Sequence, residues 1–194
     1  MAGDKEIKRY EPYGFLLVLA MVSMLGVMLY GLYKFRRNLR AGNLVAPVPD
    51  VQVYAGLGLL ALAFGFLWLA GRFLRNQAFA AFRGCLAGSF AGTVFFVVLQ
   101  VARLPMPAVN AGPAQQGYYY LGFLSGVHLL FVLIGLVANA LLLARAFRAH
   151  EYVEAFIFSV NPPNLLNLKL LARYTGFVAL LWGMVIFFLG VHVA

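Results

Sequence analysis

The sequence is poor in the residues that carry most protein chemistry. It has one cysteine, three histidines and six acidic residues among 194. The lone cysteine, Cys85, excludes a disulfide within the chain and any metal cluster built from several cysteines. Charged residues make up 11% of the chain, against about 25% in a typical soluble domain. This composition does not fit a soluble enzyme.

In place of charge, the sequence has five long apolar runs that contain no Asp, Glu, Lys or Arg. Each run is at least 19 residues long, and about 20 helical residues cross a hydrocarbon core of about 30 Å. None has the polar stripe that a soluble helix turns to water. We therefore predict an all-α integral membrane protein, with residues 1–194 forming one bundle of five transmembrane helices. The runs are residues 14–33, 51–71, 84–102, 118–144 and 174–194.

The distribution of basic residues predicts the topology. The net charge is +9, but Lys and Arg stand in ones, twos and threes at the ends of the runs, which excludes a continuous basic face for nucleic acid. Ten lie on the side of the N-terminus and five on the other side. We expect the N-terminus in the cytoplasm and the C-terminus outside, in a bacterial inner membrane. The cluster at residues 34–40 opposes this count. Residues 1–13 lead into a first run without a cleavage-site pattern, so this run is expected to be retained.

The connections between the runs give further expectations. Asp50 follows two prolines and suits the start of a helix. Residues 103–117 are predicted to form a compact outer loop. Residues 145–173 are predicted to form a cytoplasmic loop that lies partly in the membrane interface, with a break at residues 161–164. The last helix is expected to begin within residues 165–171.

His128 is the one candidate for a ligand deep in the membrane. A charge moving through hydrocarbon needs ionisable partners at depth, and the runs hold no carboxylate, which disfavours a proton-coupled carrier. A haem with two histidine ligands needs a second histidine at matching depth, and neither His150 nor His192 provides it. We expect His128 to be neutral and bonded to a neighbouring helix. No catalytic, cofactor-binding or metal-binding residue is predicted in this chain.

Small residues indicate close helix contacts. Gly84, Gly88 and Gly92 form a ladder at four-residue spacing in the third run, and Gly126 lies in the fourth. Such ladders allow helices to approach closely in lipid. The sequence leaves open whether the ladder packs within the chain or docks onto another membrane subunit.

The fourth run carries a family resemblance. Its segment Ser125-Gly126-Val127-His128 resembles the pattern S/T-G-x-H-x-x-H-V-x-x-G of subunit III of haem-copper terminal oxidases. His128 matches the first histidine of that pattern. Phe131 stands where the family has the second histidine.

The fifth run resembles the same family. Its residues 173–182 are similar to the pattern Y-W-H-F-V-D-x-x-W, in which Gly176 and Ala179 replace the histidine and the aspartate. Leu99-Gln100 matches the ending of another family span, and Met21 falls where the family has a carbodiimide-reactive glutamate. Five runs suit the short form of subunit III, which lacks the first two of seven helices. The positions kept in the fifth run are Tyr174, Phe177, Val178 and Trp182.

The resemblance implies a non-catalytic subunit of a respiratory oxidase. The complex would reduce oxygen to water with electrons from cytochrome c or quinol, and the haem and copper would lie in subunits I and II. This chain would stabilise subunit I and bind phospholipid. Tyr174, Phe177 and Trp182 would lie on the face toward lipid or another subunit, and His128 would bond one helix to another.

Two alternatives remain open at the level of sequence. One is the subunit-III-like partner of a nitric oxide reductase, which would share the fold and also lack cofactor ligands. The other is a small membrane channel or carrier, against which the absence of charge within the runs argues.

Overall fold

The structure is a computed structural model that describes the backbone of residues 2–43, 50–103, 113–149 and 151–193 and the side chains of residues 15–43, 50–102, 116–149 and 151–191. This part of the chain forms α-helices and no strand. Five of the helices, α1, α2, α3, α4 and α6, are long and apolar enough to cross a membrane, which confirms the five predicted spans. The helices are α1 (Ala2–Arg40), α2 (Val51–Arg75), α3 (Phe79–Arg103), α4 (Pro113–Arg148), α5 (Tyr152–Val160) and α6 (Pro162–Val193).

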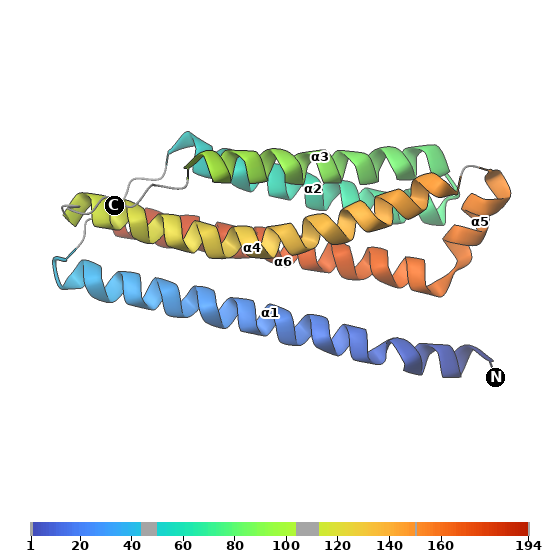
Figure 1. The fold of residues 1–194 in the computed structure, drawn as a ribbon, viewed down its shortest axis with the longest axis horizontal. Coiled ribbons are helices and arrows are strands. Elements are labelled where there is room, and N and C mark those ends of the chain that lie inside the picture. The colour runs from blue at the N-terminus through green and yellow to red at the C-terminus, as the bar shows by residue number, and fades with distance from the viewer. Residues whose placement is uncertain (1, 44–49, 104–112, 150, 194) are drawn as a thin grey trace.

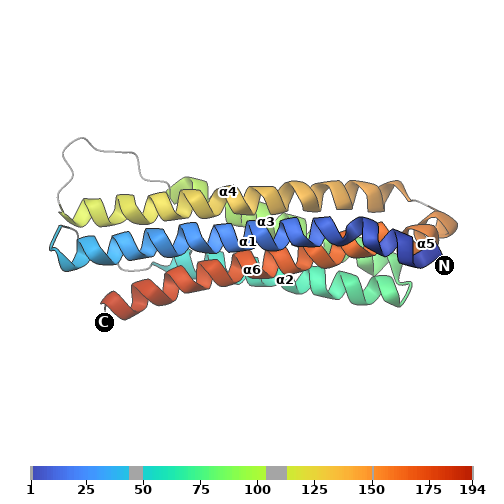
Figure 2. The ribbon, with the colours of Figure 1, turned by 90° about the horizontal axis from the view of Figure 1, so that it is seen from below.

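The five long helices run roughly along one axis and alternate in direction (Figures 1 and 2). The start of α1, the turn between α2 and α3, and α5 lie at one end of the bundle. The end of α1, the start of α4 and the end of α6 lie at the opposite end. The bundle thus has the up-and-down order that five successive spans require.

Four of the helices form a closed ring of contacts, and α1 lies outside it. In the ring, α2 packs on α3, α3 on α4, α4 on α6, and α6 on α2. α1 lies along one side of the bundle, where it packs against α4 and α6 (Figure 1). Its buried side chains are spaced three or four apart, as one face of a helix requires. The buried side chains are Met24, Met28, Leu32 and Phe35, and Gly31 on the same face is buried too.

Local sequence explains where several helices begin. Asp50 caps α2, as predicted, because its carboxylate accepts a hydrogen bond of 3.1 Å from the Val53 backbone N–H. The last helix starts at Pro162 and not within residues 165–171 as the sequence suggested. Proline fits the first turn of a helix, since the N–H that it lacks would have no partner there. The break before α6 lies at Asn161, inside the predicted segment.

One basic side chain near a helix end connects α3 with α4. The side chain of Arg83, near the start of α3, donates hydrogen bonds to the Ala146 carbonyl oxygen at 3.1 Å and to that of Ala149. The last carbonyls of a helix have no partner within it, so Arg83 satisfies the C-terminal end of α4. This basic residue therefore has a structural role besides any role in topology.

Candidate functional site

The two segments that carry the oxidase resemblance meet where α4 packs on α6. His128 of α4 has no exposed surface, and its Nε2 atom lies 2.9 Å from the carbonyl oxygen of Val178 in α6. A carbonyl oxygen only accepts hydrogen bonds, so Nε2 carries the proton and donates. His128 thus makes a bond from helix to helix, as the sequence led us to expect. Its Nδ1 atom is buried without a protein partner.

Trp182 extends this contact to α2 and α3. The side chain is fully buried, and its indole lies 4.9 Å from the His128 ring, centroid to centroid, at an angle of 31°. Phe96 of α3 presents its ring at a steep angle to both. The Trp182 Nε1–H donates a 3.1 Å hydrogen bond to the Val53 carbonyl oxygen of α2. We call Phe96, His128 and Trp182 the aromatic cluster; it joins α2, α3, α4 and α6.

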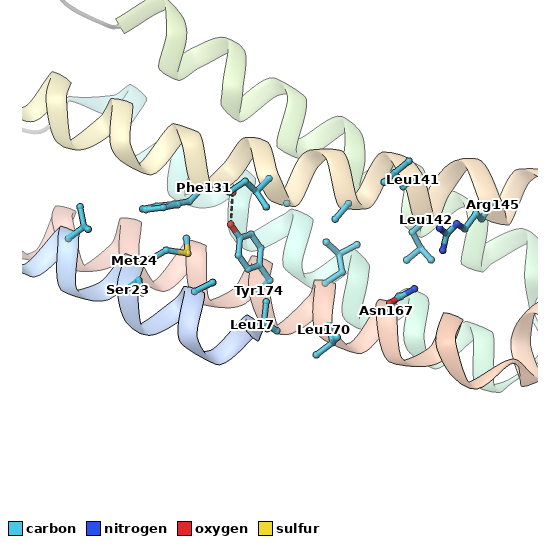
Figure 3. A pocket seen from close by; sticks show the side chains of 16 residues that line it. Leu17, Ser23, Met24, Phe131, Leu141, Leu142, Arg145, Asn167, Leu170 and Tyr174 are labelled. Carbon is cyan, nitrogen blue, oxygen red and sulfur yellow. Dashed lines mark hydrogen bonds between the residues drawn. The ribbon is translucent and has the colours of Figure 1, made fainter. Parts of the chain in front are cut away.

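Tyr174 makes a second tie between α6 and α4. Its hydroxyl donates a 2.8 Å hydrogen bond to the carbonyl oxygen of Phe131 (Figure 3). A Cβ atom at Gly135 would lie 3.1 Å from the Tyr174 ring, so the glycine leaves the room that this ring occupies. Phe131 is the position at which the family pattern has its second histidine. In this chain the backbone of that residue, and not its side chain, accepts the interhelical bond.

The expectation that Trp182 faces lipid or another subunit is wrong, and the Tyr174 side chain is largely buried as well, at the wall of a groove between α1, α4 and α6. Tyr174 is 6% exposed and Trp182 is 0% exposed within this chain alone. Each has a hydrogen-bond donor that finds a backbone carbonyl in the interior, and a donor in hydrocarbon would stay unpaired. Phe177, which has no such donor, is half-buried at the edge of the same core.

The glycine ladder divides between two environments. A Cβ atom at Gly88 would lie 3.3 Å from the Phe66 ring of α2, and one at Gly92 would lie 3.5 Å from the Leu59 carbonyl oxygen. Both glycines therefore belong to the internal contact of α3 with α2. At Gly84 an added Cβ would meet nothing within 4 Å. Gly126 of α4 is half-buried. Within this chain, the ladder thus packs against α2 at Gly88 and Gly92.

The sequence patterns did not predict a polar pair between α3 and α4. Asn139 is 2% exposed, and its Nδ2 donates a 3.1 Å hydrogen bond to the Ser89 hydroxyl. Thr93 lies one turn further along α3 and bonds back to the Ser89 carbonyl. The signal was present, because Asn139 is the one amide side chain in an otherwise apolar stretch, and such residues in spans usually bond to another helix.

The described interior has few side chains that could bind a metal ion. Within the described residues, no group of three or more His, Cys, Asp or Glu side chains could hold a metal ion. His128 offers at most its Nδ1 atom, and its nearest rings are those of Phe96 and Trp182, which are not ligands. Cys85 lies in a cluster of buried apolar side chains from α2, α3, α4, α5 and α6. Among the buried polar side chains, His128 and the Asn139–Ser89 pair link helices, whereas Thr93 bonds within α3.

Comparison with known proteins adds no relative to this picture. No family model matches the sequence, and no curated protein matches it significantly. The resemblance to oxidase subunit III therefore depends on the residues of α4 and α6 described above.

Proposed function

We propose that this chain is the subunit-III-like, non-catalytic component of a respiratory haem-copper terminal oxidase, in which it stabilises subunit I and binds lipid. One observation carries the proposal. The family-like positions of the two last spans occur in the right order in the sequence, and in the fold they contact one another. His128 bonds to Val178 and packs on Trp182, and Tyr174 bonds to the residue at the second family histidine.

The chemistry of the described spans is consistent with a subunit that has a structural role. The buried polar side chains are hydroxyls, amides and one imidazole, without a buried carboxylate, lysine or arginine among them. Such a set holds helices together but provides no chain of ionisable groups for protons. Redox chemistry would therefore belong to the haem and copper of subunits I and II, with electrons from cytochrome c or quinol.

Purification of the tagged chain in a mild detergent tests this proposal. We expect an oxidase subunit I to co-purify, identified by mass spectrometry, and the preparation to show its haem Soret band. The chain separated from that partner should show no Soret band. Co-purification without any haem protein would contradict the proposal, and so would a stoichiometric Soret band from this polypeptide alone. If a nitric oxide reductase co-purifies in place of an oxidase, the chain is the subunit-III-like partner of that reductase.

A channel or carrier makes a different prediction. The isolated chain in liposomes would then show a flux of ions or solutes that protein-free liposomes lack. We expect no difference between the two, because the bundle interior is filled by the aromatic cluster and by apolar side chains.

A further inference from the structure

The chain contains two threonines, and both point into the ring formed by α2, α3, α4 and α6. Thr93 of α3 is 6% exposed, and Thr175 of α6 is 8% exposed. α3 and α6 lie opposite each other in the ring, since each of them packs on α2 and on α4. The two threonines therefore approach the centre of the ring from opposite sides.

A small cavity lies between the two threonines. All four helices of the ring line it, with Leu60 from α2, Thr93 from α3, Val132 from α4 and Thr175 from α6 among the lining residues. Each lining residue is buried except Gly135, which is half-buried. The cavity has a volume of about 10 Å³, and about 10–15 Å³ is enough to hold one water molecule. The space therefore suits a single water and excludes a larger ligand.

The Thr175 hydroxyl is a free donor at this cavity. A threonine in a helix can donate to the carbonyl oxygen four residues before it, as Thr93 does. Thr175 makes neither this bond nor any other hydrogen bond to a described residue. No bulk water reaches the interior of a membrane bundle, so an unpaired hydroxyl there is costly.

The Thr93 hydroxyl provides an acceptor on the other side of the cavity. It donates its own proton to the Ser89 carbonyl oxygen at 2.9 Å, and the lone pairs of the hydroxyl oxygen remain. The Tyr174 hydroxyl is a less suitable donor, because it already donates to the Phe131 carbonyl oxygen at 2.8 Å. The cavity thus has a donor from α6 and an acceptor from α3, and buried waters make about two to four hydrogen bonds.

We propose that this cavity binds one structural water, which accepts a hydrogen bond from the Thr175 hydroxyl and donates one to the Thr93 hydroxyl. The direct hydrogen bonds of Trp182, Asn139 and His128 join helices that are neighbours in the ring. The water joins α3 to α6 across the ring, and it gives the Thr175 hydroxyl its partner. Because the cavity holds one molecule only, the site differs from the continuous water path of a channel.

Thr175→Val gives the first test, because valine has nearly the shape of threonine but no hydroxyl. With the water bound, the variant loses a bridge between two helices, and the melting temperature of the full chain in detergent should fall by about 2–4 °C. With a dry cavity, the variant instead removes an unpaired hydroxyl, so the melting temperature should stay the same or rise.

A double variant tests whether both hydroxyls act through the same water. Thr93→Val should also lower the melting temperature. If either change alone releases the water, Thr93→Val with Thr175→Val should fall by no more than about the larger of the two single falls. Ser125→Ala is the control, since Ser125 is 9% exposed and does not line the cavity. Its effect should add to that of Thr175→Val.

A structure of the full chain at a resolution that shows ordered waters gives the direct test. We expect one density peak at about 2.7–3.0 Å from both hydroxyl oxygens and no peak there in Thr175→Val. A wild-type cavity without density, a higher melting temperature in Thr175→Val, or additive falls for the two threonine variants would each overturn the site. The site needs no partner subunit, so its failure leaves the proposed function untouched, and loss of co-purification with subunit I leaves the site untouched.

Discussion

α6 and α1 differ in burial although both are apolar enough to span the membrane. Half of the residues in the most apolar stretch of α6 are buried within the chain, against 22% for α1, the more apolar of the two. Apolarity therefore does not decide which helix lies in the centre, because lipid is as apolar as a protein core. The two helices also differ in the polar side chains that bond to their neighbours. α6 is joined to α2 and α4 by the bonds of Trp182, Tyr174 and His128.

α1 lacks such bonds. In the described part of the chain, its only side-chain hydrogen bond stays within the helix, from Ser23 to Leu19. α1 is therefore held by the packing of its one buried face, with aromatic contacts of Phe35 at its end. We expect the two helices to respond differently to truncation of a buried side chain.

Trp182→Ala should have the largest effect on stability. It removes a fully buried indole, its contact with His128 and its hydrogen bond to Val53. Loss of such a side chain typically costs about 3–5 kcal/mol. Thermal unfolding in detergent, followed by circular dichroism, measures the loss. Phe187→Ala, in the same helix but 73% exposed, should change stability by less than about 0.5 kcal/mol. Similar melting temperatures for the two variants would show that α6 is not central.

Met28→Ala tests whether α1 is a separable element. Met28 has no exposed surface, so a cost near the lower end of the usual range, about 2 kcal/mol, is expected. Hydrogen exchange should rise in residues 15–40 and stay low in α6. Leu29→Ala, whose side chain is 49% exposed, is the control and should leave exchange unchanged. A rise of the same size in α6 would mean that α1 and the ring of helices unfold together.

Gly88→Leu should weaken the contact between α2 and α3. The new side chain would meet the Phe66 ring, which lies 3.3 Å from an added Cβ and would have to shift, and overpacking costs about 1–3 kcal/mol. The unfolding temperature of the purified chain is the readout. Gly84→Leu changes a glycine of the same ladder that has nothing within 4 Å of an added Cβ, so it should be close to neutral. An equal fall in unfolding temperature for both variants would show that Gly88 does not lie in the contact between α2 and α3.

His128→Leu should have the smallest effect. It removes the bond to Val178 but also removes the buried Nδ1 atom that has no partner. Bonds between helices in membranes are worth about 0.6 kcal/mol on average and at most about 1.7. His128→Gln keeps a donor for the carbonyl and should lose less, as measured by the same unfolding assay. A loss above about 3 kcal/mol in His128→Leu would indicate a further role for the imidazole.

The sequence predicted the number of spans because charge is costly in hydrocarbon and its absence is easy to see. It predicted the cap at Asp50 because this bond is local. It did not predict the start of α6. Proline usually ends a helix, but it also fits the first turn of one, as Pro162 and Pro163 do here. The sidedness of the basic residues stays a prediction, as do the partner subunits.

The candidate site was harder to predict than the spans. The spacing of Gly84 and Gly88 shows that they share a face of α3, but it does not show which part of that face α2 covers. The family resemblance places Trp182 and Tyr174 toward lipid or another subunit, and nothing local in the sequence opposes that placement. Their interior positions depend on carbonyls of Val53 and Phe131 that lie far away in the sequence.

Oxygen consumption over time, by the complex with and without this chain, tests the central claim most directly. The described spans contribute helix contacts and no buried carboxylate, lysine or arginine, so under the proposed assignment the depleted complex should begin at nearly the full rate and then lose activity sooner, because the surface of the proposed subunit I loses its cover. An immediate loss of most activity, with the haem content unchanged, would contradict the account. In that case the chain would supply a group to the reaction itself, and His128 would be the first residue to test.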